Sequence, residues 1–334
     1  MRIAGTLRGI GAALLLALAL VIGGGAQAAD KTKVVIATDF VPHGMHAGLF
    51  LAKHKGWFDE AGLDVEILDG KGSATTIQQV AAGQLDIGFA QLAAMAPAIS
   101  NGVPVISVMG FVRAGDNGMM VPADSGWTTL KQLKGKKLAI PAGSATAAFA
   151  DAFFKAGGVS RSDFTIVNLD TSALVAAYAS GGVDGALSTV AYFAPIVADK
   201  RPSKGILFSS VGLNVPGYGL VVRKNELDSR QDMIGKFVAV QQKTWNYIFA
   251  GHKDEAIDAV LAERAGARLD RKIIAGQLAL YMPLFDTPAT KGKPLGWQAE
   301  SDWESALKAM KEVNMVKPEF KPADFYTNRF IPMK

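Results

Sequence analysis

One order of secondary structure, strand–helix–strand–helix–strand–helix, is predicted twice in this chain, over residues 33–100 and 137–198. Each copy opens with a short apolar run typical of a buried strand and continues through a polar turn into a segment of helical spacing. Alternating strands and helices favour a mainly parallel sheet with helices on both faces. Ligands bind such sheets beyond the carboxyl ends of the strands, so two facing sheets would enclose a cleft. One continuous doubly wound sheet is the alternative that the pattern leaves open.

Two segments are suited to cross between the predicted lobes. The first contains the Gly-Asp-Asn-Gly stretch 115–118, and the second contains the Val-Pro-Gly-Tyr stretch 215–218. With hinges there, lobe one comprises residues 30–121 and 218–334, and lobe two comprises residues 122–217. The C-terminal part of lobe one shows apolar spacings of three and four and is expected to be mostly helical.

The first 29 residues have the features of a secretory signal peptide. Two arginines precede an apolar run over residues 10–22, and a small-residue stretch ending in Ala28-Ala29 follows it. The apolar run is short for a membrane span of about 20 residues. We therefore expect cleavage after Ala28 or Ala29 and a soluble mature protein in the periplasm.

Composition excludes several classes of protein. The chain has no cysteine, so disulfides, thiolate metal sites, cysteine nucleophiles and lipid attachment at the cleavage site are all excluded. The formal net charge of +5 comes without a basic tract, so nucleic acid is not an expected partner.

Catalytic motifs are also missing from the sequence. Ser144, His46 and Asp170 are the residue types of a hydrolytic triad, but the stretch 143–146, Gly-Ser-Ala-Thr, lacks the second glycine of a nucleophile elbow. No glycine-rich dinucleotide or phosphate loop occurs. We expect no enzyme activity and no cofactor.

Three stretches of the first copy carry more specific sequence. Residues 52–58 read Ala-Lys-His-Lys-Gly-Trp-Phe, residues 61–66 read Ala-Gly-Leu-Asp-Val-Glu, and residues 82–88 read Ala-Gly-Gln-Leu-Asp-Ile-Gly. Together they resemble the periplasmic substrate-binding proteins of ATP-binding-cassette importers. The branch is the one related to thiamine-pyrimidine biosynthesis proteins, which also holds sulfonate, taurine and nitrate binders. The resemblance covers roughly residues 33–225. It implies a two-lobed type II periplasmic-binding-protein fold, a small-molecule ligand and a membrane permease as partner.

The turn after the first strand resembles binders of pyrimidine precursors more narrowly. Those proteins carry an Asp-Trp-x-Pro turn followed by a histidine and a glycine at the head of the first helix. Here residues 39–42 read Asp-Phe-Val-Pro and residues 46–48 read His-Ala-Gly. Phe40 stands in place of the tryptophan and His43 in place of an asparagine. The acidic residue that such binders often carry in the second lobe has no clear match near residues 187–193.

Nine residues at predicted strand ends, helix starts or the second hinge are predicted to bind the ligand. Phe40 can stack on a flat ring, and the two histidines can donate to or accept from ring nitrogens. These histidines could also hold a metal, but no carboxylate motif accompanies them, and we predict no metal site. The predicted ligand-binding residues are Phe40, His43, His46, Ser73, Gln91, Ser144, Thr146, Ser188 and Tyr218.

The serines among these residues allow two interpretations. Ser73 and Ser144 each open a predicted helix, where a serine commonly caps the helix. The free backbone N–H groups at such an end also suit an anion or a carbonyl group of a ligand.

The sequence therefore predicts a monomeric solute-binding protein that closes two lobes over a pyrimidine-like or other flat aromatic heterocycle and delivers it to a permease. The alternative ligand is a small organic anion, such as a sulfonate, taurine, nitrate or an aromatic carboxylate, held at Ser73 and Ser144. A ligand sensor for a membrane receptor and a pyrimidine-related enzyme are the minor alternatives.

Overall fold

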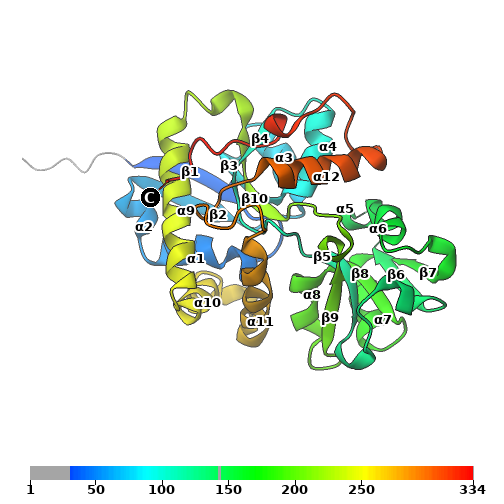
Figure 1. The fold of residues 1–334 in the computed structure, drawn as a ribbon. Coiled ribbons are helices and arrows are strands. Elements are labelled where there is room, and N and C mark those ends of the chain that lie inside the picture. Colours follow the sequence, from blue (N-terminus) through cyan, green and yellow to red (C-terminus); the bar gives the residue numbers. More distant parts are fainter. Residues whose placement is uncertain (1–30, 142–143, 334) are drawn as a thin grey trace, which may run out of the picture.

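The computed structural model describes residues 31–141 and 144–333, and the predicted signal peptide lies outside them. These residues form two lobes that lie side by side, each built on one five-stranded sheet (Figure 1). The strand order is β2-β1-β3-β10-β4 in lobe one and β7-β6-β8-β5-β9 in lobe two. Two separate sheets were predicted and are confirmed, and the alternative of one continuous sheet is wrong.

Lobe one contains the first four strands and most of the helices. Its strands are β1 (Thr32–Ala37), β2 (Leu63–Leu68), β3 (Ile87–Gln91), β4 (Val105–Gly110) and β10 (Tyr218–Arg223). Its helices are α1 (Ala47–His54), α2 (Trp57–Glu60), α3 (Ser73–Ala81), α4 (Leu92–Ser100), α9 (Gln231–Phe249), α10 (Lys253–Glu263), α11 (Arg271–Tyr281) and α12 (Glu300–Glu312). The expected helical C-terminal part is therefore present.

Lobe two is the smaller of the two. Its strands are β5 (Asn117–Pro122), β6 (Lys137–Pro141), β7 (Thr165–Leu169), β8 (Gly185–Thr189) and β9 (Ser203–Leu207). Its helices are α5 (Ala145–Ala148), α6 (Ala150–Ala156), α7 (Thr171–Ala179) and α8 (Val190–Val197).

In each sheet one strand opposes the other four. Strand β1 pairs in parallel with β2 and β3, whereas β10 is antiparallel to both β3 and β4. In the second sheet β5 is likewise antiparallel to β8 and β9. Strands β5 and β10 are the first strands after the chain crosses between lobes. Each crossing therefore leads into one reversed strand. Both sheets are otherwise parallel, which confirms the prediction of mostly parallel sheets.

The chain crosses between the lobes at residues 111–116 and 208–217, and the two crossings touch. Gly115 has φ of 63°, and a Cβ atom there would lie 2.2 Å from the carbonyl oxygen of Val215, so this position requires glycine. The first crossing ends earlier than the sequence predicts. Residues 117–121, which were assigned to lobe one, belong to β5 of the second sheet, where β8 and β9 satisfy their backbone groups.

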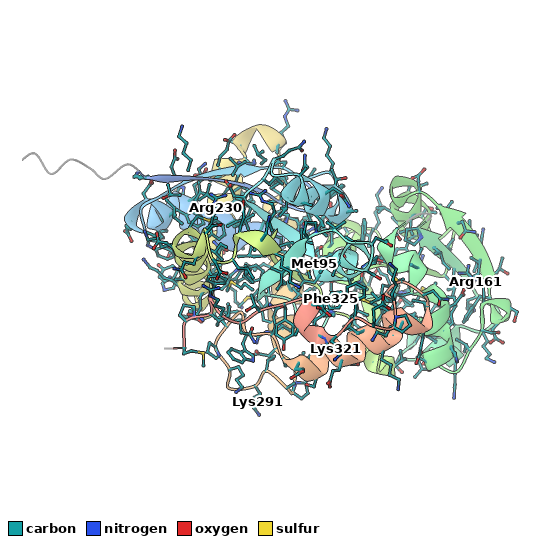
Figure 2. The ribbon with its side chains drawn as sticks, turned by 90° about the horizontal axis from the view of Figure 1, so that it is seen from above. Met95, Arg161, Arg230, Lys291, Lys321 and Phe325 are labelled. Carbon is teal, nitrogen blue, oxygen red and sulfur yellow. The ribbon has the colours of Figure 1, made fainter. Side chains whose placement is uncertain are left out.

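Alternate residues of a strand face different apolar clusters, as strand geometry requires. Val34 and Ile36 of β1 pack with residues of α1, α9, α10 and α11, whereas Val35 packs against the cluster that holds α3, α4 and α12. Met95 of α4 and Phe325 belong to that second cluster and lie inside lobe one (Figure 2). The sheet of lobe one is therefore covered by apolar side chains on both faces.

Two local predictions differ from the structure. The apolar spacing over residues 147–156 predicts a single helix, but the structure divides this region at Phe149 into α5 and α6. Strand β9 was not predicted, because its sequence Ser-Lys-Gly-Ile-Leu has one β-branched residue and weak alternation. Among the described residues, no helix combines the length and the apolar character that crossing a membrane needs.

Candidate functional site

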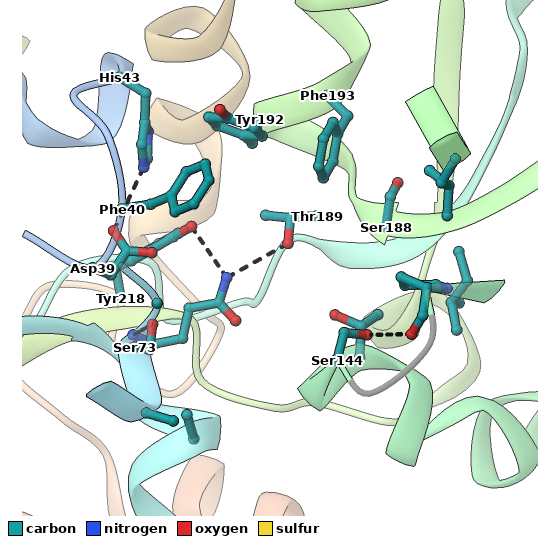
Figure 3. Close-up of a pocket in the computed structure, with 18 residues that line it drawn as sticks. Asp39, Phe40, His43, Ser73, Ser144, Ser188, Thr189, Tyr192, Phe193 and Tyr218 are labelled. Carbon is teal, nitrogen blue, oxygen red and sulfur yellow. Dashed lines mark hydrogen bonds and ion pairs between the residues drawn. The ribbon is translucent and has the colours of Figure 1, made fainter. Parts of the chain in front are cut away.

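A cavity of about 310 Å³ lies between the two lobes (Figure 3). It sits at the carboxyl ends of β1, β3, β6 and β8, where ligands of open α/β sheets bind. Its volume suits a small molecule. All the predicted ligand residues except His46 line it, namely Phe40, His43, Ser73, Gln91, Ser144, Thr146, Ser188 and Tyr218.

His46 lies behind the cavity wall, where it supports Asp39. Its side chain is fully buried, and its Nε2 atom lies 2.8 Å from Oδ1 of Asp39. The Nδ1 atom of His46 accepts the backbone N–H of His43, and the Nδ1 atom of His43 accepts that of Met45, both at 3.3 Å. In the neutral form of either ring, the hydrogen therefore sits on Nε2. His46 donates to Asp39, and the Nε2 atom of His43 lies 3.6 Å from the same oxygen.

Asp39 is the charged residue of the cavity, and sequence reasoning did not select it. Burial raises the pKa of Asp39, but hydrogen bonds and Coulombic attraction from His43 and His46 outweigh burial and hold the pKa well below its usual range. Burial lowers the pKa of His46 to about 4, so its ring is neutral at pH 7. Among the described residues that line the cavity, Asp39 supplies the one carboxylate, and no lysine or arginine is present. Its position two residues after the end of β1, and four and seven residues before two histidines, is a signal that could have found it.

The same three residues form a candidate metal-binding group, which was not predicted. One ligand atom from each of Asp39, His43 and His46 lies within 4.8 Å of the others. A metal bound to Nε2 of a neutral histidine leaves the hydrogen on Nδ1. In both histidines Nδ1 already faces a backbone N–H group, so that hydrogen would meet another donor. The arrangement fits a carboxylate held by two histidines better than a metal centre.

Aromatic rings from both lobes wall the cavity. Phe40 is 42% exposed and meets Tyr192 of α8 edge to face, with ring centroids 6.1 Å apart. Tyr192 also meets His43 edge to face at 5.0 Å and Phe193 at 4.8 Å. Tyr192 and Phe193 were not predicted, although the sequence shows this aromatic pair three and four residues after the end of β8. The rings leave a slot suited to a flat apolar group.

Polar contacts cross the cleft on the other side of the cavity. The amide Nε2 of Gln91 donates to the hydroxyl of Tyr218 at 3.1 Å and reaches Oγ1 of Thr189, in lobe two, at 3.5 Å. The hydroxyl of Ser73 accepts the backbone N–H of Gln91 at 3.0 Å. The N-cap of α3 is Gly72, so the predicted capping role of Ser73 is wrong.

The lobe-two serines and threonine have different roles. Ser144 caps α5, because its Oγ accepts the backbone N–H of Ala147 at 3.1 Å, as predicted. Thr146 donates to Oδ1 of Asn117 at 3.1 Å. Ser188 is 2% exposed, and its hydroxyl has no hydrogen-bond partner among the described residues. A buried hydroxyl in a cavity wall that lacks a partner is suited to a ligand.

We expect Ser188→Ala to separate ligand binding from stability. Removing an unpartnered buried hydroxyl should leave the midpoint of unfolding in urea unchanged or slightly higher. Affinity for the ligand should fall about fivefold to tenfold, the worth of one hydrogen bond. Ser107→Ala is the matched control, since that buried hydroxyl bonds the side chain of Gln298 outside the cavity. The control should cost about 1 kcal/mol of stability and leave affinity unchanged. Unchanged affinity in Ser188→Ala would remove Ser188 from the site.

Solved structures of low sequence identity share this fold. The periplasmic aliphatic sulphonate binding protein SsuA of Escherichia coli superimposes with a TM-score of 0.67 at 15% identity, covering 87% of this chain and 91% of that one. The periplasmic nitrate-binding protein NrtA of Synechocystis gives a TM-score of 0.63 at 14% identity, covering 90% and 87%. The chain therefore has the predicted two-lobed type II periplasmic-binding-protein fold.

Sequence comparison identifies the family. A formylaminopyrimidine-binding protein of Halalkalibacterium halodurans is 23% identical over 82% of this chain and 83% of its own length. The model of the family described as NMT1/THI5 like matches residues 43–256, more than half of the chain. The chain belongs to the NMT1/THI5-like family.

Proposed function

We propose that this protein is an extracytoplasmic solute-binding protein that closes its two lobes over a flat, nitrogen-containing aromatic ring and delivers it to a membrane ATP-binding-cassette importer. The observation that carries the proposal is the composition of the cavity. Aromatic side chains from both lobes wall it, and one ionised carboxylate, Asp39, lies at its base.

This composition favours a ligand that donates hydrogen bonds. The carboxylate of Asp39 and the side-chain carbonyl of Gln91 can accept hydrogen bonds, and the amino groups of a heterocycle can donate them. A relative named for formylaminopyrimidine binding supports the same ligand class. A small organic anion such as a sulfonate is the second candidate, since sulfonate- and nitrate-binding proteins share the fold. The ionised Asp39 and the absence of lysine and arginine from the described lining weigh against an anion.

A panel of ligands tests the proposal by thermal shift. The panel holds 4-amino-5-hydroxymethyl-2-methylpyrimidine, other aminopyrimidines, flavins, aromatic carboxylates, taurine, alkanesulfonates and nitrate. A ligand at a hundredfold excess over its Kd stabilises the protein by about 2.7 kcal/mol and raises the melting temperature. Shifts with heterocycles alone support the proposal, and shifts with sulfonates or nitrate alone would overturn the aromatic-ring assignment.

We expect Phe40→Ala to weaken a bound heterocycle by about 1 kcal/mol or more, because the ring loses its stacking partner. An anion held by backbone groups should bind the variant as well as the wild type. Leu68→Ala is a matched control, because Leu68 is similarly exposed at 39% and lies outside the cavity lining. Titration calorimetry of both variants with the best ligand of the panel measures the difference.

An enzyme of pyrimidine synthesis is less well supported. A 4-amino-5-hydroxymethyl-2-methylpyrimidine phosphate synthase of Saccharomyces cerevisiae is 31% identical, but the match covers only 32% of each chain. The two solved structures named above are of binding proteins, and the superposition with this chain covers nearly their whole length.

A further inference from the structure

We propose that Gln277 of α11 is a positioning residue that fixes Tyr192 of lobe two against the ligand-binding turn of lobe one. Gln277 is 2% exposed and lies outside the cavity lining. Its Oε1 atom accepts the backbone N–H of Gly44 at 3.0 Å, and its Nε2 atom donates to the carbonyl of Tyr192 at 3.0 Å. One buried amide thus joins the two lobes outside the covalent crossings. The inference does not depend on the identity of the ligand.

The lobe-one half of this contact is tightly packed. The turn that holds His43 continues into a short helix, Gly44–His46, that lies on α11. A Cβ atom on Gly44 would lie 2.6 Å from the backbone nitrogen of Leu278 and 2.8 Å from Cβ of Gln277. The turn and α11 therefore move as one unit, and the amide of Gln277 is held in place relative to His43.

The lobe-two half is the start of α8, which carries Tyr192. Helices α8 and α11 lie side by side across the cleft (Figure 1). A Cβ atom on Gly276 would lie 3.0 Å from the Cβ atom of Pro195 in α8, so the two helices pack tightly at this point. Lys272 and Asp199 form an ion pair at the rim, but both are well exposed and add little. The hydrogen bond from Gln277 is therefore the directional link between the helices.

This link bears on the site through the aromatic wall. Tyr192 meets the rings of Phe40 and His43, which belong to the turn on the other side of Gln277. If the amide is removed, nothing directional holds the carbonyl of Tyr192 at its present distance from that turn. We infer that the lobes then spend more time in a different relative position.

Spin labels on the two lobes test the inference without a ligand. The chain has no cysteine, so Lys71→Cys in lobe one and Ala176→Cys in lobe two, both exposed, can be labelled specifically. Gln277→Met removes both hydrogen bonds. We expect it to change the ratio between the populations of the two inter-label distances about fivefold to tenfold, relative to the labelled chain that keeps Gln277. Pulsed electron paramagnetic resonance measures the distances in the purified protein.

Gln242→Met is the matched control. Gln242 is also a buried amide, and it donates to the carbonyls of Leu295 and Pro332, both within lobe one. Its variant should lose stability without changing the inter-label distances. Gln277→Glu at pH 9 is a second variant, whose ionised carboxylate accepts the N–H of Gly44 but cannot donate to Tyr192. Wild-type distances in both Gln277 variants, or an equal change in the control, would overturn the proposal. A failed ligand screen would leave this result unaffected.

Discussion

Asp116→Asn is expected to stabilise the protein by up to about 4 kcal/mol at pH 8 and to have little effect on stability near pH 4. Asp116 lies in the first crossing, fully buried, and neither carboxylate oxygen has a hydrogen-bond partner among the described residues. Burial is the main cause that raises its pKa from 3.8 to about 7. Contacts with its own backbone and with the Tyr281 hydroxyl lower the pKa, but that value already includes their smaller effect. At pH 8 the wild-type protein must hold a buried ionised carboxylate that the Asp39 carboxylate repels, whereas asparagine carries no charge.

The sign of the pH dependence follows from which state binds the proton. Between pH 3.8 and about 7 the folded protein keeps the proton of Asp116, whereas the unfolded chain has lost it. The contribution of Asp116 to the free energy of unfolding therefore falls as the pH rises through that window. His46 acts in the opposite direction. Its pKa is about 4 in the folded protein and 6.5 in the unfolded chain, so its contribution rises between those values.

Urea unfolding from pH 4 to pH 8.5 measures both contributions. The two slopes oppose each other in the wild type from about pH 4 to 6.5, so Asp116→Asn should unmask a stability that rises with pH in this range. Asp64→Asn is the control, because Asp64 is exposed on β2 and should give the wild-type profile. Parallel profiles for Asp116→Asn and the wild type would show that Asp116 is ionised at low pH even when buried.

Asp39→Asn is expected to weaken binding of an aminopyrimidine about tenfold to a hundredfold. A hydrogen bond to a charged group is worth about 1.5–3 kcal/mol, and asparagine keeps the shape of the side chain but not its charge. Because the pKa of Asp39 is held well below its usual range, wild-type affinity should not vary with the ionisation of this residue near neutral pH. The measurement is titration calorimetry with the pyrimidine that gives the largest thermal shift.

The control for this change is Asp69→Asn. Asp69 is an exposed aspartate that pairs with Arg264 at 2.9 Å and does not line the cavity. Its variant should bind the same ligand with wild-type affinity. Equal affinities for wild type and Asp39→Asn would mean that the ligand donates no hydrogen bond to the Asp39 carboxylate, and that Asp39 only holds His46 and the turn.

Much of the fold could be predicted because it is encoded locally. Apolar spacing predicts a helix over residues 271–281, and alternation predicts a strand over residues 63–68. Both elements have those bounds in the structure. Both segments repeat their apolar residues with the period of their own backbone, which needs no knowledge of distant residues. The end of the first crossing was placed too late along the chain. The apolar sequence of residues 117–122 would suit a strand of either sheet, and only the pairing with β8 and β9 decides its lobe.

The cavity lining was also largely predictable from strand ends. Phe40, Gln91, Ser144 and Ser188 follow predicted strands, and the geometry of parallel sheets brings such positions to one edge. Tyr192 and Phe193 were not selected, because on α8 they read equally well as residues of the apolar core. Their place in the wall depends on how lobe two faces lobe one.

The sequence by itself determined two βα copies, the helical C-terminal part, the absence of thiol chemistry and most of the strand-end residues, since these depend on residue type and short-range periodicity. Only the tertiary structure decided that Asp39 is a charged residue of the cavity lining and that His46 supports it. It also decided that the Asp116 carboxylate is buried with no hydrogen-bond partner among the described residues. Ionisation depends on burial and on neighbours distant in sequence, and the position of one lobe on the other depends on contacts such as that of Gln277 with Tyr192. No short stretch of the chain contains that information.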